Sequence, residues 1–288
     1  MNTSALQRFF QQEDLNFLVT NRIPRIAVTR AMGWFSQIRS PLLARLSIAV
    51  WQVFTELDLS DAKKHRFESL HDCFTRELLA GARPVDGDPG VLTSPCDAIV
   101  GELGRIEQGR LYQAKGMPYA MRELFGPAQE LQPFEGGQFL TLRLTSAMYH
   151  RFHAPDAARL EHVSYLSGDC WNVNPIALKR VERLFCRNER AVLRMRLADG
   201  TPLAIVPVAA VLVASIRLHA LDVEQHLRQK SERSGAHEWP CEASYERGQE
   251  MGWFQHGSTL IVFVPPGFEP AVHTGQRLRM GQALMRRV

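Results

Sequence analysis

The stretch IVPVAAVLVASI, residues 205–216, is a nearly continuous apolar run. It is shorter than the roughly 18–20 residues that a membrane-spanning helix needs, and it is rich in valine, which favours strands. We therefore predict a buried strand within 203–217. Short apolar or alternating runs separated by turn residues recur on both sides of it, and they predict a strand-rich body from about residue 91 onward, with strands at 98–106, 138–144, 191–197 and 259–264.

The chain before residue 91 has a different texture. Residues 15–55 contain no Asp or Glu, and their apolar residues recur at helical spacing with a break at Pro41. This pattern predicts two amphipathic helices. A further helix is expected over residues 60–80, ending at Gly81, followed by a loop.

The fold class predicted from these patterns is α+β, with N-terminal amphipathic helices followed by a strand-rich, barrel-like catalytic body. The expected division is a membrane-docking helical region over 1–58 and a catalytic domain over 59–288. The polar residues 222–250 are expected to form a loop or an irregular excursion. The C-terminal residues 273–288 are expected to form short strands joined by glycine turns.

Two interpretations of the basic N-terminal helices are open and compatible. Their apolar faces could pack on the body, or a basic face bearing aromatic residues could lie on an anionic membrane leaflet. The residues predicted to dock are the arginines and the aromatic pair of the first helix: Arg22, Arg25, Arg30, Trp34, Phe35 and Arg39. The chain start does not resemble a signal peptide, and no apolar run is long enough to span a bilayer, so the protein is expected to be soluble or to lie on a membrane.

Composition excludes several classes. The 288 residues carry 34 Lys and Arg against 30 Asp and Glu, a net charge of +4, and are 45% hydrophobic, which argues against a disordered chain. Five scattered cysteines do not suggest a disulfide framework or a zinc site. No nucleotide-binding motif or nucleic-acid signature is present, and we expect no metal site and no nucleic-acid partner.

Three short segments carry candidate chemistry. Asp97 follows a turn in SPCDAIV, His150 and His153 lie in YHRFHAP, and Ser258 follows Gly257 in HGSTLIVFVPP. A serine hydroxyl becomes reactive when a base takes its proton, and a carboxylate can orient that base. A hydrolase that keeps Ser258 as a permanent nucleophile is one reading, although no GxSxG motif accompanies it.

Taken in order, several segments resemble the phosphatidylserine decarboxylase family of the bacterial proenzyme type. The resemblance covers about residues 65–265. Its most specific part is Gly257-Ser258-Thr259, which the family usually precedes with Leu where this chain has His256; Ala98 likewise stands where the family usually has Gly. The other matching segments are FTRELLAGARPVD (74–86), SPCDAIVGELGRI (94–106), QAKGMPY (113–119), YHRFHAP (149–155), GDCWNVNP (168–175), FCRNERAV (185–192) and GQEMGWFQHGST (248–259).

The resemblance implies that the chain cleaves itself between Gly257 and Ser258. The products would be a large chain, 1–257, and a small chain, 258–288, which stay associated. Ser258 would become a covalent pyruvoyl group, the cofactor of the enzyme. By matching position, His153 would be the base for cleavage, Asp97 its orienting carboxylate, and His150 a proton-transfer group in the later decarboxylation.

The implied reaction is the decarboxylation of phosphatidylserine to phosphatidylethanolamine. The pyruvoyl carbonyl would condense with the substrate amine and withdraw electrons as CO₂ leaves. The implied partners are phosphatidylserine in an anionic leaflet, the two chains of one precursor and a possible homodimer. The expected location is peripheral, on the cytoplasmic face of the cell membrane.

Overall fold

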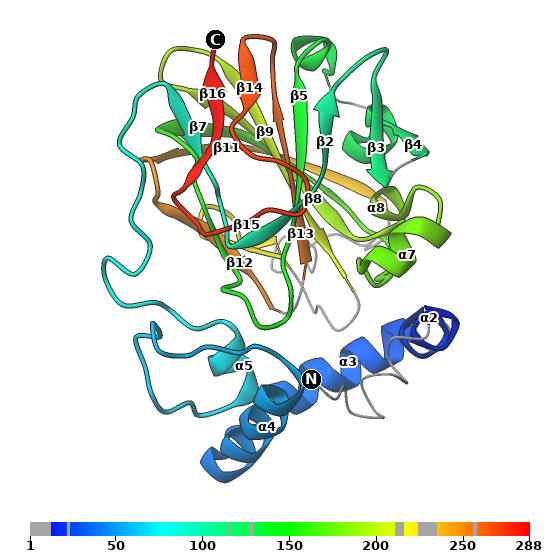
Figure 1. Cartoon of the computed structure of the whole chain (residues 1–288), viewed down its shortest axis with the longest axis vertical. Coiled ribbons are helices and arrows are strands. Elements are labelled where there is room, and N and C mark those ends of the chain that lie inside the picture. The colour runs from blue at the N-terminus through cyan, green and yellow to red at the C-terminus, as the bar shows by residue number, and fades with distance from the viewer. Residues whose placement is uncertain are drawn as a thin grey trace.

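The computed structural model describes residues 13–21, 24–114, 116–126, 130–210, 216–223, 235–255 and 258–288. Helices precede a strand-rich body, and in Figure 1 the blue N-terminal helices lie below that body. This arrangement confirms the predicted α+β class. The N-terminal helices are α2 Glu13–Asn21, α3 Arg25–Ser36 and α4 Pro41–Phe54, followed by the short α5 Leu70–Phe74.

The helix starts follow from local sequence. α4 begins at Pro41, which needs no hydrogen bond for its nitrogen in a first helical turn, and the Ser40 hydroxyl accepts a hydrogen bond from the Leu43 amide at 3.4 Å. α3 begins directly after Pro24. The predicted break at Pro41 is therefore confirmed. Within the described residues, no helix is both long and apolar enough to cross a bilayer.

The central sheet has eight strands in the order β11-β7-β8-β9-β13-β5-β2-β15. Each neighbouring pair is antiparallel. β13, the strand that starts at Ser258, lies between β9 and β5 in the middle of this order. The bounds are β2 Ala98–Arg105, β5 Gln138–Arg143, β7 Ala158–Leu166, β8 Arg190–Leu197, β9 Pro202–Ala209, β11 Ala236–Tyr245, β13 Ser258–Val264 and β15 Arg277–Leu278.

Smaller sheets complete the body, which wraps round a common interior (Figure 1). One pairs β10 Ile216–Leu218, β12 Glu250–Phe254 and β6 Arg151–His153. Another pairs β1 Val91–Thr93, β16 Ala283–Arg287 and β14 Phe268–Pro270. The third pairs β3 Arg110–Ala114 with β4 Met117–Ala120. Short helices lie between strands: α6 Met121–Phe125, α7 Pro175–Arg180, α8 Leu184–Arg187 and the 3₁₀ helix η1 Gln132–Phe134.

One large apolar core joins the faces of these sheets. Phe125 and Phe263 meet edge to face in it, with ring centroids 4.9 Å apart. Burial of such aromatic side chains is a principal source of stability. A second, smaller cluster links α4 to the segment after it and consists of Ile48, Leu57, Ala62, Phe67 and Cys73. α4 therefore packs against residues on the far side of residue 58, the predicted end of the helical region.

The helix expected over 60–80 is wrong in extent, because only Leu70–Phe74 is helical. The chain doubles back instead. Ala62 forms a β-bridge with Leu78, the Lys63 amide donates to the Glu77 carbonyl, and the Leu79 amide donates to the Asp61 carbonyl. The apolar side chains of Phe67 and Phe74 in this segment are nevertheless buried, 8% and 4% exposed.

Two strand predictions also need correction. Part of the stretch expected to be a loop over 222–250 is the edge strand β11, whose Pro240 is tolerated because it lies at a register shift on the sheet edge. The run predicted as one strand over 203–217 forms β9, which ends at Ala209, and β10, which belongs to another sheet; 211–215 lie outside the described residues. The strands predicted at 98–106, 138–144, 191–197 and 259–264 and the short C-terminal strands are confirmed.

Candidate active site

Ser258 is the first residue of β13. Its backbone lies opposite Ala209 of β9, and the next residue, Thr259, lies between Val208 of β9 and Arg143 of β5. His256 and Gly257 lie outside the described residues. The predicted cleavage point is thus placed at the end of a strand that is paired on both sides.

The segments carrying Asp97 and His153 lie side by side. The backbone amide of His153, at the end of β6, donates to the carbonyl of Pro95 at 2.8 Å. Both side chains are buried, with 7% of each residue exposed. A second backbone hydrogen bond, from the Thr93 amide to the Pro155 carbonyl at 3.0 Å, also joins the two segments, so residues 56 positions apart in sequence are held close together.

The hydrogen bonds of His153 define its tautomer. Its Nδ1 lies 2.9 Å from the carbonyl oxygen of Gly248, which can only accept, so Nδ1 carries a proton. Burial lowers the pKa of His153 below 6.5, although the Gly248 hydrogen bond and the charges of Glu250 and Asp97 oppose the shift. The ring is therefore neutral at pH 7. Its Nε2 accepts a hydrogen bond from the Tyr149 hydroxyl at 3.0 Å.

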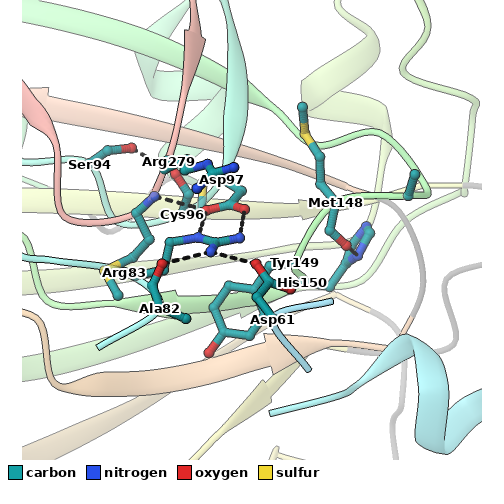
Figure 2. A network of polar contacts seen from close by, with 12 residues as sticks. Asp61, Ala82, Arg83, Ser94, Cys96, Asp97, Met148, Tyr149, His150 and Arg279 are labelled. Atoms are coloured by element: carbon teal, nitrogen blue, oxygen red, sulfur yellow. Dashed lines mark hydrogen bonds and ion pairs between the residues drawn. The ribbon is translucent and has the colours of Figure 1, made fainter. Parts of the chain in front are cut away.

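The Asp97 carboxylate accepts hydrogen bonds from the Arg83 guanidinium (Figure 2). The Arg83 guanidinium donates to both Asp97 oxygens, at 2.8 and 2.6 Å, and its third nitrogen donates to Asp61 at 2.7 Å. The Met280 amide donates to Asp97 at 2.9 Å. Burial alone would lower the pKa of Arg83, but the Asp97 and Asp61 carboxylates outweigh it and raise that pKa.

Asp97 was predicted to orient His153 directly, but in this structure it is hydrogen-bonded to Arg83 instead. The orienting acceptor at Nδ1 is the Gly248 carbonyl, and Asp97 acts on the ring through space as one of the charges that raise its pKa. Tyr149 lies beside both networks: its ring centroid is 5.9 Å from the Arg83 guanidinium and 5.7 Å from the His153 ring.

His150 is fully buried against α5. Its ring centroid is 4.0 Å from that of Phe74, and its Nδ1 donates to the Met148 carbonyl at 2.8 Å. Its own carbonyl accepts from the Phe254 amide at 2.9 Å, at the end of β12. β12 ends four residues before Ser258, so this hydrogen bond joins His150 to the strand that precedes the predicted cleavage point.

An apolar cavity of about 790 Å³ lies between the N-terminal helices and the end of the sheet. Arg143 and Ala210 form part of its wall. Arg143 is paired with Thr259, and Ala210 follows Ala209, which is paired with Ser258, so this wall adjoins the start of β13. Helical side chains cover it from the other side: Met32, Phe35, Leu46, Val50, Trp51 and Phe74. A polar cavity of about 340 Å³ lies next to Asp97, Arg83 and Tyr149.

The residues predicted to dock on a membrane differ in their exposure to solvent. Trp34 is 72% exposed, and Arg30 and Arg39 are also exposed. Phe35 is half-buried and lines the apolar cavity. Arg22 lies outside the described residues.

Arg25 faces the body of the protein rather than an open surface. Its guanidinium forms an ion pair with Asp169 at 2.6 Å and lies 3.7 Å from the ring centroid of Trp171. It therefore holds α3 to the loop after β7. The expectation that Arg25 is available for a membrane does not fit this placement.

The sequence did not indicate Arg83, Tyr149 or Arg143 as site residues. Arg83 and Tyr149 lie within segments quoted for the family resemblance, beside the predicted residues, and a basic side chain near a buried carboxylate could have been sought there. Arg143 is a lone charge in the apolar strand QFLTLRL (138–144), and that contrast is a signal in itself.

Comparison with known proteins identifies the family of the chain. The family model described as phosphatidylserine decarboxylase matches residues 70–286. Curated relatives named phosphatidylserine decarboxylase proenzyme include that of Brevibacillus brevis, 34% identical over 92% of this chain and 95% of the relative. The one from Bordetella avium is 36% identical over 94% of this chain and 95% of the relative, and the one from Ectopseudomonas mendocina is 36% identical over 91% and 94%. The chain belongs to the phosphatidylserine decarboxylase family.

The Arg83 network generates a stability prediction. Arg83→Met leaves Asp97 and Asp61 buried or half-buried without their shared cation, so the free energy of unfolding should fall by about 3–5 kcal/mol. Urea unfolding followed by tryptophan fluorescence measures the change. Lys63→Met, which removes an exposed ion pair with Glu77, is the control and should cost less than about 1 kcal/mol. Equal losses in the two variants would contradict the assigned role of Arg83.

Proposed function

We propose that this chain is the self-processing precursor of an enzyme that decarboxylates phosphatidylserine to phosphatidylethanolamine. The observation that carries the proposal is the position of Ser258, at the start of a strand held between β9 and β5 and beside a large apolar cavity. Family membership and the proenzyme names of the relatives support it.

The cleavage converts one peptide bond into a carbonyl group on the new chain end. The Ser258 hydroxyl oxygen attacks the carbonyl carbon of Gly257, its proton passes to the base, and the C–N bond breaks as the amide nitrogen is protonated, leaving an ester. Loss of the Cα proton of residue 258 then expels the Gly257 carboxylate and leaves dehydroalanine. Water replaces the nitrogen, which leaves as ammonia, and residue 258 becomes a pyruvoyl group.

His153 is the base in this proposal. It is neutral at pH 7, and Nε2 is the nitrogen with a free electron pair because Nδ1–H is held by Gly248. The Tyr149 hydroxyl occupies Nε2, so the proton reaches His153 either through this hydroxyl or after the hydroxyl turns away. The nearby Asp97 charge favours the protonated ring that forms.

The two products would remain together. Residues 258–288 contain β13, β14, β15 and β16, which pair with strands of the large chain at β5, β9, β2 and β1. Side-chain contacts add to this pairing, because the Asp97 carboxylate accepts from Met280. The backbone amide of Ser94, in the large chain, also donates to the Gln282 carbonyl of the small chain at 2.7 Å.

In the second reaction, a pyruvoyl group at residue 258 would supply a carbonyl that condenses with the substrate amine and accepts electrons as CO₂ leaves. The chain's own residues have three tasks. In this proposal the apolar cavity would hold acyl chain, the end of the sheet would orient the headgroup, and His150 would transfer a proton. The position of residue 258 beside the cavity fits a reaction at a lipid headgroup.

The alternative of a hydrolase with Ser258 as a permanent nucleophile is not favoured. Such a triad relies on a carboxylate at the Nδ1 of its histidine. In this structure the Nδ1 partner of His153 is the Gly248 carbonyl, and the Asp97 carboxylate contacts Arg83.

The processing proposal predicts the fate of Ser258→Ala. The wild-type chain should yield chains of 257 and 31 residues on a denaturing gel, whereas Ser258→Ala, which lacks the attacking oxygen, should remain a single chain of 288 residues. Ser146→Ala, which alters another serine at the cavity wall, is the control and should be cleaved normally. A wild-type chain that decarboxylates phosphatidylserine while uncleaved would overturn the proposal.

We infer further that the protein binds peripherally to an anionic leaflet through α4 as well as α3. One side of α4 carries an exposed apolar stripe, with Leu42 70%, Val53 79% and Phe54 62% exposed. Leu46 and Val50 continue this stripe and also line the apolar cavity, so the cavity adjoins the surface that would meet the lipid. A homodimer stays a prediction of the family resemblance.

The docking surface generates a binding prediction. Replacing Leu42, Val53 and Phe54 together with serine should weaken binding to vesicles containing phosphatidylserine by at least about tenfold, because three apolar side chains no longer enter the interface. Vesicle sedimentation measures the change. The control replaces Leu79 and Tyr112, two large side chains outside α4 that are 48% and 44% exposed, and should leave binding intact. Unchanged binding of the triple variant would show that α4 is not the docking surface.

A further inference from the structure

Arg143 is the charged residue in the wall of the apolar cavity. It is the last residue of β5, and its backbone lies opposite Thr259 of β13 on one side and Ile99 of β2 on the other. It therefore sits on the strand next to the one that begins at Ser258. About half of the remaining lining residues come from α3, α4 and α5, and most of those are aliphatic or aromatic.

The Arg143 guanidinium has no hydrogen-bond acceptor or ion-pair partner among the residues that the structure describes. Three other enclosed arginines are well matched: Arg83 binds two carboxylates, Arg25 binds Asp169, and Arg190 donates to four backbone carbonyls. A fourth, Arg76, lies in the wall of the polar cavity and donates through one nitrogen to the Ala147 carbonyl, while its Nε and Nη1 have no hydrogen-bond partner among the described residues. Burial lowers the pKa of Arg143, with no neighbouring charge to oppose the shift.

A partly buried cation without an ion-pair partner is costly, because it has lost part of its hydration and no anion compensates for that loss. A guanidinium remains charged under these conditions, so an anion in the cavity would recover the lost interaction. Most of the cavity wall is apolar, with a smaller polar part formed by Ser47, Thr145, Ser146, Asn172 and Asn174. Such a wall matches a ligand that carries both a negative charge and hydrocarbon. Arg143 is thus suited to an anionic amphiphile.

Given the proposed function, on which this inference rests, we propose that Arg143 binds the phosphodiester of the phospholipid substrate and thereby sets the position of the headgroup. The planar guanidinium can donate to two phosphate oxygens at once. The acyl chains then occupy the apolar cavity, and the headgroup lies across the ends of β5 and β13.

The geometry suits this placement. In phosphatidylserine only an oxygen and two carbons separate the phosphorus from the amine nitrogen. Neighbouring strands lie about 4.8 Å apart, a separation that so short a headgroup can span. A phosphate on Arg143 therefore leaves the amine within reach of residue 258 on the next strand.

The phosphodiester is favoured over the substrate carboxylate as the ligand. The carboxylate loses its charge as CO₂ forms, so a strong ion pair with it would stabilise the ground state more than the transition state and slow the reaction. The phosphodiester keeps its charge from substrate to product. An arginine on the phosphate adds binding energy without opposing the chemical step.

The test uses the wild-type protein, Arg143→Gln, Arg143→Lys and the control Arg110→Gln, which alters an exposed arginine of β3. Each is first examined on a denaturing gel for cleavage into two chains. Decarboxylation of dihexanoyl phosphatidylserine then gives kcat and KM. Inhibition by dihexanoyl phosphatidylglycerol, which has the phosphodiester but neither amine nor carboxylate, reports phosphate binding separately.

The proposal expects cleavage in all four proteins. Arg143→Gln should raise KM by about 10- to 100-fold with little change in kcat, and should weaken inhibition by phosphatidylglycerol by a similar factor. Arg143→Lys should recover part of both, because it restores charge but not the planar fork. Arg110→Gln should match the wild type.

Three results would overturn the assignment of Arg143. They are a fall in kcat with unchanged KM, unchanged inhibition by phosphatidylglycerol despite a raised KM, and no effect of either Arg143 variant. Failure of the proposed function is a separate result: a cleaved wild-type protein would then not decarboxylate the serine lipid at all. In that case the phosphatidylglycerol affinities of wild type and Arg143→Gln would still decide whether Arg143 binds a phosphodiester.

Discussion

The pairing of β13 with β5 and β9 is the constraint on which the rest of the structure depends. Residues Thr259–Val264 pair with β5, and residues Ser258–Phe263 pair with β9. A strand held on both sides has a fixed register, because a slip by one residue would turn its buried side chains outward. The position of residue 258 is therefore set by the most enclosed part of the sheet. A cleavage just before the strand would leave this pairing intact.

Arg83 and Arg143 differ in whether their charge is matched, and this difference distinguishes a structural role from the proposed ligand binding. The charge of Arg83 is matched by Asp97 and Asp61, and the Asp97 carboxylate also holds Met280, so this network ties the two predicted chains together. Arg143 has no such match among the described residues and faces an apolar cavity. The first arginine completes a structural ion-pair network, and the second leaves a positive charge for a ligand to neutralise.

Local sequence pattern was sufficient to predict the strands at 98–106, 138–144 and 259–264, because their apolar residues report burial directly. It failed for β11, where Pro240 and an exposed polar face conceal an edge strand, and for the segment 60–80, where pairing across the turn outweighs helical spacing.

The candidate site residues Asp97, His153 and Ser258 were singled out from three short segments, and the family resemblance supplied their predicted roles. Neither source predicts the hydrogen-bond partners of these residues. The contacts of Asp97 with Arg83 and of His153 with Tyr149 and Gly248 depend on folded geometry. Arg143 was missed because its isolation becomes visible only when the cavity around it is known.

The central claim is that the chain makes its own cofactor from Ser258. Intact-mass analysis of the purified small chain tests it most directly, with and without a carbonyl reagent such as phenylhydrazine. The account predicts a mass lower than that of residues 258–288 by one ammonia and a further adduct with the reagent. A small chain with the full mass and an unreactive N-terminal serine, in a preparation that decarboxylates phosphatidylserine, would contradict it.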